Sequence, residues 1–186
     1  PVERLKYGPT DVGAYADYTT NGRVSPTAVC VLLAAGLRDR PDWSGLFTGP
    51  PEYLDYDTGG CPPGNLKGQT GRTKLRLVTD GLSHTIMYVP DAGRPNYYTD
   101  VQLQTSSAGV ARWADPDTEF WSHNLCAGGT SMMNCNNENE MYSFHQGGGN
   151  YSFADGSVHF LTDSLDGDLQ VSLITRAGDD VATNIQ

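Results

Sequence analysis

Apolar and polar side chains alternate along short stretches in the second half of the chain. Residues 150–154 and 157–161 each alternate in this way, and Asp155-Gly156 lies between them. Asp-Gly between two alternating runs is a strong hairpin signal, because a tight two-residue turn needs positive φ angles that glycine adopts easily. The pattern predicts a β-hairpin in which Gly156 has a structural role in the turn.

The pattern changes to a helical period directly after this hairpin. Leu165, Leu169 and Leu173 recur every four residues, and Gly178 follows as a plausible stop. Such spacing places the three leucines on one face of a helix. We expect an amphipathic helix that opens at Thr162 or Asp163 and covers one face of a sheet.

Weaker patterns occur earlier in the chain. Residues 74–79 alternate like a half-buried strand, and residues 85–89 have β character; Asp80 could start a turn or cap a helical turn between them. Ser25-Pro26 is typical of a helix start, and the apolar run after it over 28–37 fits a short buried helix or a strand.

Composition favours a turn-rich chain. The 186 residues include 22 glycines and 11 prolines, with only 18% charged residues. Glycine and proline are concentrated in residues 38–73, which predicts a long loop region, and residues 1–24 lack periodicity, which predicts an irregular segment. We expect one domain over residues 1–186, of α+β class and β-rich, with an antiparallel sheet, a C-terminal hairpin and a covering helix.

Charge and hydropathy exclude some classes of binding partner. The formal net charge is −10 and no run of lysine and arginine offers a track for phosphates, so nucleic acid and anionic membrane surfaces are poor partners. No apolar stretch reaches the roughly 20 residues of a membrane span, and Pro1-Val2-Glu3-Arg4 lacks signal-peptide anatomy. We expect this fragment to make no membrane contact and an exported protein of this sequence to be a mature or trimmed form.

The four cysteines are not spaced as paired CxxC motifs, which argues against zinc and allows up to two disulfides. They are Cys30, Cys61, Cys126 and Cys135. We favour a short disulfide loop between Cys126 and Cys135. The alternative is four buried thiols in a reducing compartment.

Two groups of polar residues are candidates for metal chemistry. His145 near Asp155 could bind a metal or transfer a proton, as in a metal-dependent hydrolase, or the imidazole could cap the hairpin. Asn136, Glu138 and Glu140 form an oxygen-rich patch of the kind that calcium prefers, although asparagine-rich loops also form their own turns.

Aromatic residues are candidates for a third kind of site, one that binds a sugar. Tyr97 and Tyr98 could stack on a sugar, with His145, Asn150 and Asp155 as polar groups, or the rings could fill a small satellite core. The motifs of common enzyme classes are missing, namely GxSxG, HExxH, a Walker loop and GxGxxG after a strand. We therefore expect a protein that is not an enzyme and has no cofactor other than the calcium ion considered above.

Three blocks resemble one known family. His145 is followed by nine residues and then by Asp155-Gly156, residues 79–85 read TDGLSHT, and residues 175–178 read TRAG. Over residues 74–178 the chain resembles the planctomycete DUF1559 family, with its prepilin-associated H-X9-DG region.

The resemblance implies a location and a role. Such proteins begin with a prepilin-type leader and a long hydrophobic helix, and they display a globular head outside the inner membrane. It implies an extracytoplasmic pilin-like or pseudopilin-like head that acts in surface assembly or display, with protein subunits, including copies of itself, as partners. A solute- or glycan-binding module is the alternative.

Overall fold

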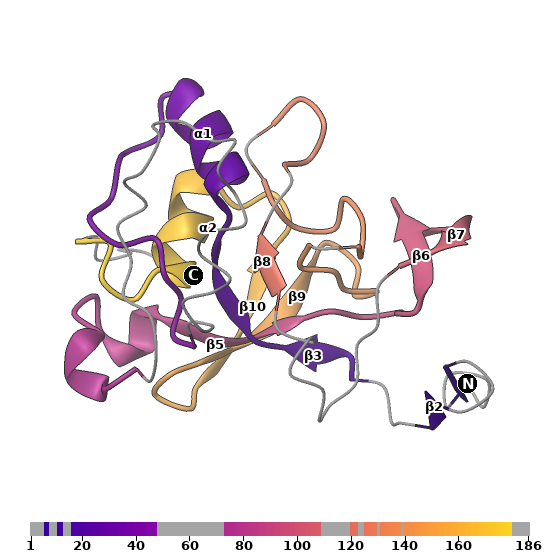
Figure 1. Cartoon of the computed structure of the whole chain (residues 1–186), viewed down its shortest axis with the longest axis horizontal. Helices are drawn as coiled ribbons and strands as arrows, with labels where there is room; N and C mark the ends of the chain where they lie inside the picture. The colour runs from indigo at the N-terminus through magenta and orange to yellow at the C-terminus, as the bar shows by residue number, and fades with distance from the viewer. Residues whose placement is uncertain are drawn as a thin grey trace.

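The computed structural model describes residues 6–7, 11–12, 16–47, 73–108, 120–122, 125–129, 131–138 and 140–179 (Figure 1). This part of the chain has the expected α+β class, with a four-stranded antiparallel sheet and two α-helices. The elements in order are β1 Lys6–Tyr7, β2 Asp11–Val12, β3 Tyr18–Thr19, β4 Asn21–Val24, α1 Pro26–Ala34, η3 Leu75–Leu77, η4 Leu82–His84, β5 Ile86–Pro90, β6 Asn96–Thr99, β7 Gln102–Ser107, β8 Phe120–Ser122, β9 Gly148–Phe153, β10 Val158–Thr162 and α2 Gly167–Ile174.

The central sheet has the strand order β10-β9-β5-β3, so β10 and β3 are its edges. One face of this sheet is the inner face, which carries Tyr151, Phe153 and Leu161 into the core. Helix α2 packs against that face, and α1 lies on the same side of the sheet (Figure 1). The C-terminal half of α2 is buried over residues 170–174, and of the three leucines predicted to share one face Leu165 lies before the helix and Leu169 is half-buried. A short helix gains most of its stability from such packing.

The hairpin of β9 and β10 is confirmed, but its turn is longer than predicted. The strand pairing closes at Phe153 and Ser157, which leaves a three-residue loop of Ala154, Asp155 and Gly156. Only Gly156 in this loop has positive φ, at 88°. The Gly156 amide donates to the Phe153 carbonyl and closes a turn followed by a left-handed glycine, which is the usual three-residue hairpin loop.

Helix α2 begins later than predicted. Thr162 still pairs with Gly148 in the sheet, and the Asp166 carboxylate accepts hydrogen bonds from the amides of Asp168 and Leu169 at 2.9 and 3.4 Å. Because this cap sits at Asp166, the helix opens at Gly167 and not at Thr162 or Asp163. It ends at Ile174, ahead of Gly178.

The strand predicted over residues 74–79 is wrong. A short 3-10 helix, η3, forms there, and the Leu77 amide donates to the Lys74 carbonyl at 2.8 Å. The alternation failed as a signal because Leu75 stays 69% exposed and no buried face forms. The expected strand after it is present as β5, and the helical turn between them is η4. Asp80 does not cap that turn, since its carboxylate accepts from the Gly178 amide at 2.6 Å.

The region around residue 25 matches the helical alternative. Ser25 caps α1 by accepting from the Ala28 amide at 3.2 Å, and Pro26 occupies the first turn. Before it, where the sequence predicts an irregular segment, the structure has four short strands; β3 pairs with β5 and β4 pairs with β8. Strands of two to four residues are too short to show a period. Of the predicted loop region, residues 48–72 lie outside the described residues.

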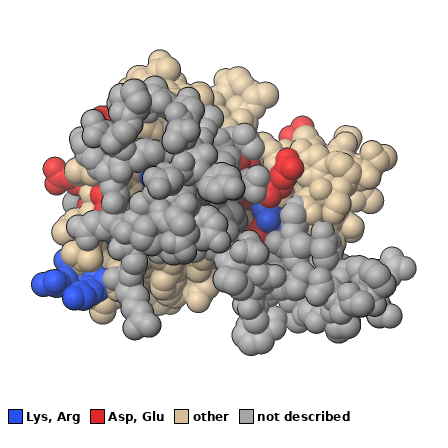
Figure 2. Space-filling model, in the orientation of Figure 1, with Lys and Arg blue, Asp and Glu red and all other residues tan. Residues whose placement is uncertain are grey.

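Buried arginines tie the loops to the helices. Arg40 donates to the Asp168 carboxylate at 2.7 Å, and Arg176 lies 3.7 Å from Asp42. Both arginine side chains are almost fully buried, as is Arg23. In the view of Figure 2, exposed acidic side chains occur at several separate places, whereas the exposed basic ones gather mainly at one side. These three arginines therefore place positive charge in the interior of the described part of the chain.

The predicted disulfide between Cys126 and Cys135 is present, and Cys30 is also disulfide-bonded. Disulfides persist in oxidising compartments, so these bonds are typical of an exported protein. In the part of the chain that the structure describes, no helix is long and apolar enough to span a membrane.

Replacing Cys126 and Cys135 together by serine is expected to lower the free energy of unfolding by about 2–3 kcal/mol, because the bond closes a short loop in the unfolded chain. The cysteines are 9 residues apart in sequence, and the bond at Cys30 stays intact in the double variant. Urea unfolding of the double variant and the wild type measures the loss. Equal stability would show that this bond contributes nothing.

Candidate functional site

The structure separates the two most prominent candidate residues. His145 lies before β9, and Asp155 lies in the turn after it. Six strand residues at roughly 3.3 Å each place the two ends of β9 about 20 Å apart. The exposed Asp155 carboxylate instead accepts from the Ser157 amide and hydroxyl at 2.9 and 2.7 Å, which lowers the pKa of Asp155. A metal site built on both His145 and Asp155 is not assembled.

His145 instead belongs to a surface pocket of about 290 Å³. The pocket lies where β3 pairs with the end of β5, next to the segment that leads into β9. Its described lining residues are Asp17, Tyr18, Pro90, Ala92, Ser143, Phe144 and His145. Two exposed aromatic rings, a carboxylate and an imidazole therefore share one pocket. We call this the β3–β5 pocket.

An aromatic cluster holds one wall of the pocket in place. The Phe144 ring meets Tyr98 and Tyr142 edge to face, with ring centroids 4.9 and 5.5 Å apart. Gly93 allows this approach, since a Cβ atom there would lie 2.9 Å from the Tyr98 ring and 3.0 Å from that of Phe144. The predicted stacking residue Tyr98 thus supports the pocket wall from behind. Tyr97 is half-buried and makes none of these contacts.

A buried ion pair lies beneath the same wall. Asp91 is fully buried, and Arg94 Nε lies 2.8 Å from Asp91 Oδ1. The Nε–H, however, donates to the Asn137 carbonyl at 2.8 Å, and neither oxygen of Asp91 accepts a hydrogen bond within the described part of the chain. Burial therefore raises the pKa of Asp91 to about 7, against the attraction of Arg94 and with a further rise from Asp17.

Asn137 connects this ion pair to the aromatic cluster. Its side-chain oxygen accepts from the Tyr98 amide at 2.8 Å, and its amide nitrogen donates to the carbonyls of Ala92 and Asn96 at 3.0 and 2.8 Å. The side chain is fully buried. These hydrogen bonds join Ala92, which lines the pocket from the β5–β6 connection, to Asn96 and Tyr98 of β6.

The three residues predicted to bind calcium have different surroundings. Asn136 accepts from the Glu138 amide at 2.9 Å, the Glu138 side chain is exposed, and Glu140 is fully buried. Glu140 and Glu138 both act on Arg94, whose pKa is lowered by burial and raised by their charges. The described residues contain no group of three or more histidine, cysteine or acidic side chains that could hold a metal. Calcium binding by Asn136, Glu138 and Glu140 stays a prediction.

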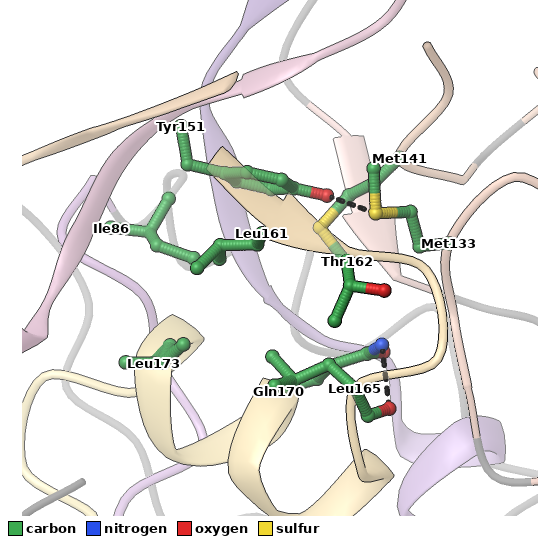
Figure 3. Close-up of a pocket in the computed structure, with 9 residues that line it drawn as sticks. All are labelled: Ile86, Met133, Met141, Tyr151, Leu161, Thr162, Leu165, Gln170 and Leu173. Carbon is green, nitrogen blue, oxygen red and sulfur yellow. Dashed lines mark hydrogen bonds between the residues drawn. The ribbon is translucent and has the colours of Figure 1, made fainter. Parts of the chain in front are cut away.

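Asn150 and a small core cavity lie apart from the described lining of the β3–β5 pocket, and ligand binding by Asn150 stays a prediction. Asn150 is half-buried in β9, opposite Phe160 of β10. A second cavity, of about 10 Å³, lies inside the core between the sheet and α2 (Figure 3). Around it Tyr151 donates to Met133 Sδ at 3.0 Å, and Gln170 donates to the Leu165 carbonyl at 3.1 Å. A void of this size holds at most one water.

The sequence indicated His145 but not its neighbours in the pocket. Asp17 and Tyr18 come from the N-terminal segment that lacked periodicity, and they reach the site only because β3 pairs with β5. Phe144 directly precedes His145, so its position next to the H-X9-DG block was the only available signal.

Comparison with known proteins gives one match. The sequence model of the family described as "Protein of unknown function (DUF1559)" matches residues 39–168. No curated protein matches the chain, and no solved structure does.

Proposed function

Because the chain belongs to the DUF1559 family, we propose that it is a non-enzymatic extracytoplasmic head domain, pilin-like or pseudopilin-like, that acts in surface assembly or display. The disulfides at Cys30 and between Cys126 and Cys135 support export, since such bonds persist in oxidising compartments. The H-X9-DG block from His145 to Gly156, on which the prepilin-associated resemblance depends, is the second reason for the proposal.

The observation that carries the proposal is the position of strand β10 at an edge of the sheet, where no other strand of the described residues pairs with it. The odd-numbered residues of β10 face β9, because the flanking pairs Phe153–Ser157 and Gly147–Asp163 are hydrogen-bonded and antiparallel pairs alternate. The backbone N–H and C=O groups of Val158, Phe160 and Thr162 consequently point away from the sheet. The Thr162 carbonyl already accepts from the Leu165 amide at 3.1 Å, whereas the groups of Val158 and Phe160 and the Thr162 amide form a row that can pair with another strand.

The side chains of this edge also favour association. Val158 is 64% exposed and Phe160 is 52% exposed, and β10 contains neither a proline nor a side chain of fixed charge. Soluble proteins usually protect edge strands with lysine, proline or bulges. An unprotected apolar edge therefore fits a strand that pairs with a neighbouring subunit, for which a second copy of the chain is the simplest partner.

Replacing Val158 by lysine is expected to weaken self-association at least tenfold, because the charge must be desolvated at the paired edge. Sedimentation velocity over a concentration series measures the association. Val31→Lys is the matched control, since Val31 is 50% exposed on α1 and the substitution changes the net charge equally. If both variants associate like the wild type, or if the wild type stays monomeric throughout the series, assembly through β10 is contradicted.

A further inference from the structure

We propose that the β3–β5 pocket binds a neutral sugar ring. The proposal is independent of assembly, since the pocket lies beside β3 at one edge of the sheet and the assembly edge is β10 at the other. A sugar ring has an apolar face of C–H groups and a rim of hydroxyl groups. The pocket offers a surface for each.

The apolar part of the pocket consists of two aromatic rings. Tyr18 is 45% exposed and Phe144 is 51% exposed, so both keep free surface in a folded chain. Phe144 is held by its edge-to-face contacts with Tyr98 and Tyr142. Because this ring is fixed before a ligand arrives, little side-chain entropy is lost when a sugar stacks on it.

The polar part of the pocket supplies complementary hydrogen-bonding groups. The Asp17 carboxylate accepts hydrogen bonds, and the His145 imidazole can donate one and accept one when neutral. Asp17 is held in place, since its backbone carbonyl accepts from the Asp91 amide at 2.8 Å and its Oδ1 accepts from the Gly93 amide at 3.4 Å. Adjacent sugar hydroxyls both donate and accept, and these two side chains match that requirement.

Size and charge select among sugars. A pocket of about 290 Å³ is at the small end of ligand sites, which suits one ring better than a long chain. The described lining residues include Asp17 and neither lysine nor arginine. A carboxylated or phosphorylated sugar would bring a second negative group next to the Asp17 carboxylate, so a neutral ring is favoured.

Titration with methyl glycosides of glucose, galactose, mannose and N-acetylglucosamine, followed by NMR chemical shifts, tests the proposal. At least one of them is expected to perturb the resonances of Tyr18, Phe144 and His145. Phe144→Ala is expected to weaken that binding at least tenfold, whereas Phe47→Ala, another exposed phenylalanine outside the pocket, leaves it unchanged.

A second variant covers the case in which Phe144→Ala disturbs the aromatic cluster. Tyr18→Ala removes a ring for which no ring–ring contact occurs among the described residues, and it too should weaken binding. Three results overturn the proposal. The first is that no glycoside shifts these resonances up to about 10 mM, tenfold above a Kd of about 1 mM. The second is that Tyr18→Ala binds the glycoside as well as Phe47→Ala does. The third is that tetramethylammonium shifts these resonances while the glycosides do not, which would identify a cation site.

Discussion

Replacing Asn137 by alanine is expected to lower the free energy of unfolding by about 4 kcal/mol. The side chain makes three buried hydrogen bonds, to the Tyr98 amide and to the carbonyls of Ala92 and Asn96. Each backbone group left without its partner costs about 1–3 kcal/mol when it stays buried. Three such groups would cost about 3–9 kcal/mol together, and partial relaxation and entry of water place the expected loss in the lower part of that range.

The neighbouring asparagine provides the control. Asn136 makes a local hydrogen bond to the Glu138 amide at the surface, so Asn136→Ala is expected to cost about 1 kcal/mol. Urea unfolding of the two variants, followed by far-UV circular dichroism, gives the comparison. Equal losses in the two variants would contradict the central place assigned to Asn137.

Stability is expected to fall as the pH rises from about 4 to about 7, through the buried carboxyl of Asp91. Burial raises the folded-state pKa of Asp91 from 3.8 to about 7, so within this window the folded state holds a proton that the unfolded state has lost. Rising pH therefore favours unfolding. Because one pKa unit corresponds to about 1.4 kcal/mol, the loss approaches about 4 kcal/mol above pH 7.

Asp91→Asn tests this prediction directly. The amide has nearly the shape of the protonated carboxyl and does not ionise, so the variant should match the wild type near pH 4 and become the more stable of the two near pH 8. Thermal unfolding across this range measures the difference. Asp155→Asn, at an exposed carboxylate, should retain the wild-type fall. A parallel pH dependence for Asp91→Asn and the wild type would refute the assignment.

The sequence predicted those elements whose signals are local. The β9–β10 hairpin, α1, β5 and the disulfide between Cys126 and Cys135 each depend on residues close together in the chain. The exact turn was not predictable, since Asp155-Gly156 suits both a two-residue and a three-residue loop. The start of α2 was also misplaced, because Thr162, Asp163 and Asp166 can all cap a helix.

The candidate site was predictable only in part, because long-range pairing builds it. His145 and Tyr98 were expected to take part, but Asp17 and Tyr18 reach the pocket through the pairing of β3 with β5. The sequence also contained no indication that Asp91 and Arg94 are buried as a pair. Charged residues in a polar segment are ordinarily solvated, and only the fold shows that these two are not.

Amide hydrogen exchange of β10 tests the assembly proposal most directly. The account predicts that the amides of Val158, Phe160 and Thr162 exchange readily in the dispersed chain and become protected when the chain assembles, while those of His159 and Leu161 are protected in both states because they face β9. Protection that does not change on assembly at Val158, Phe160 and Thr162 would contradict the account and place the contact elsewhere.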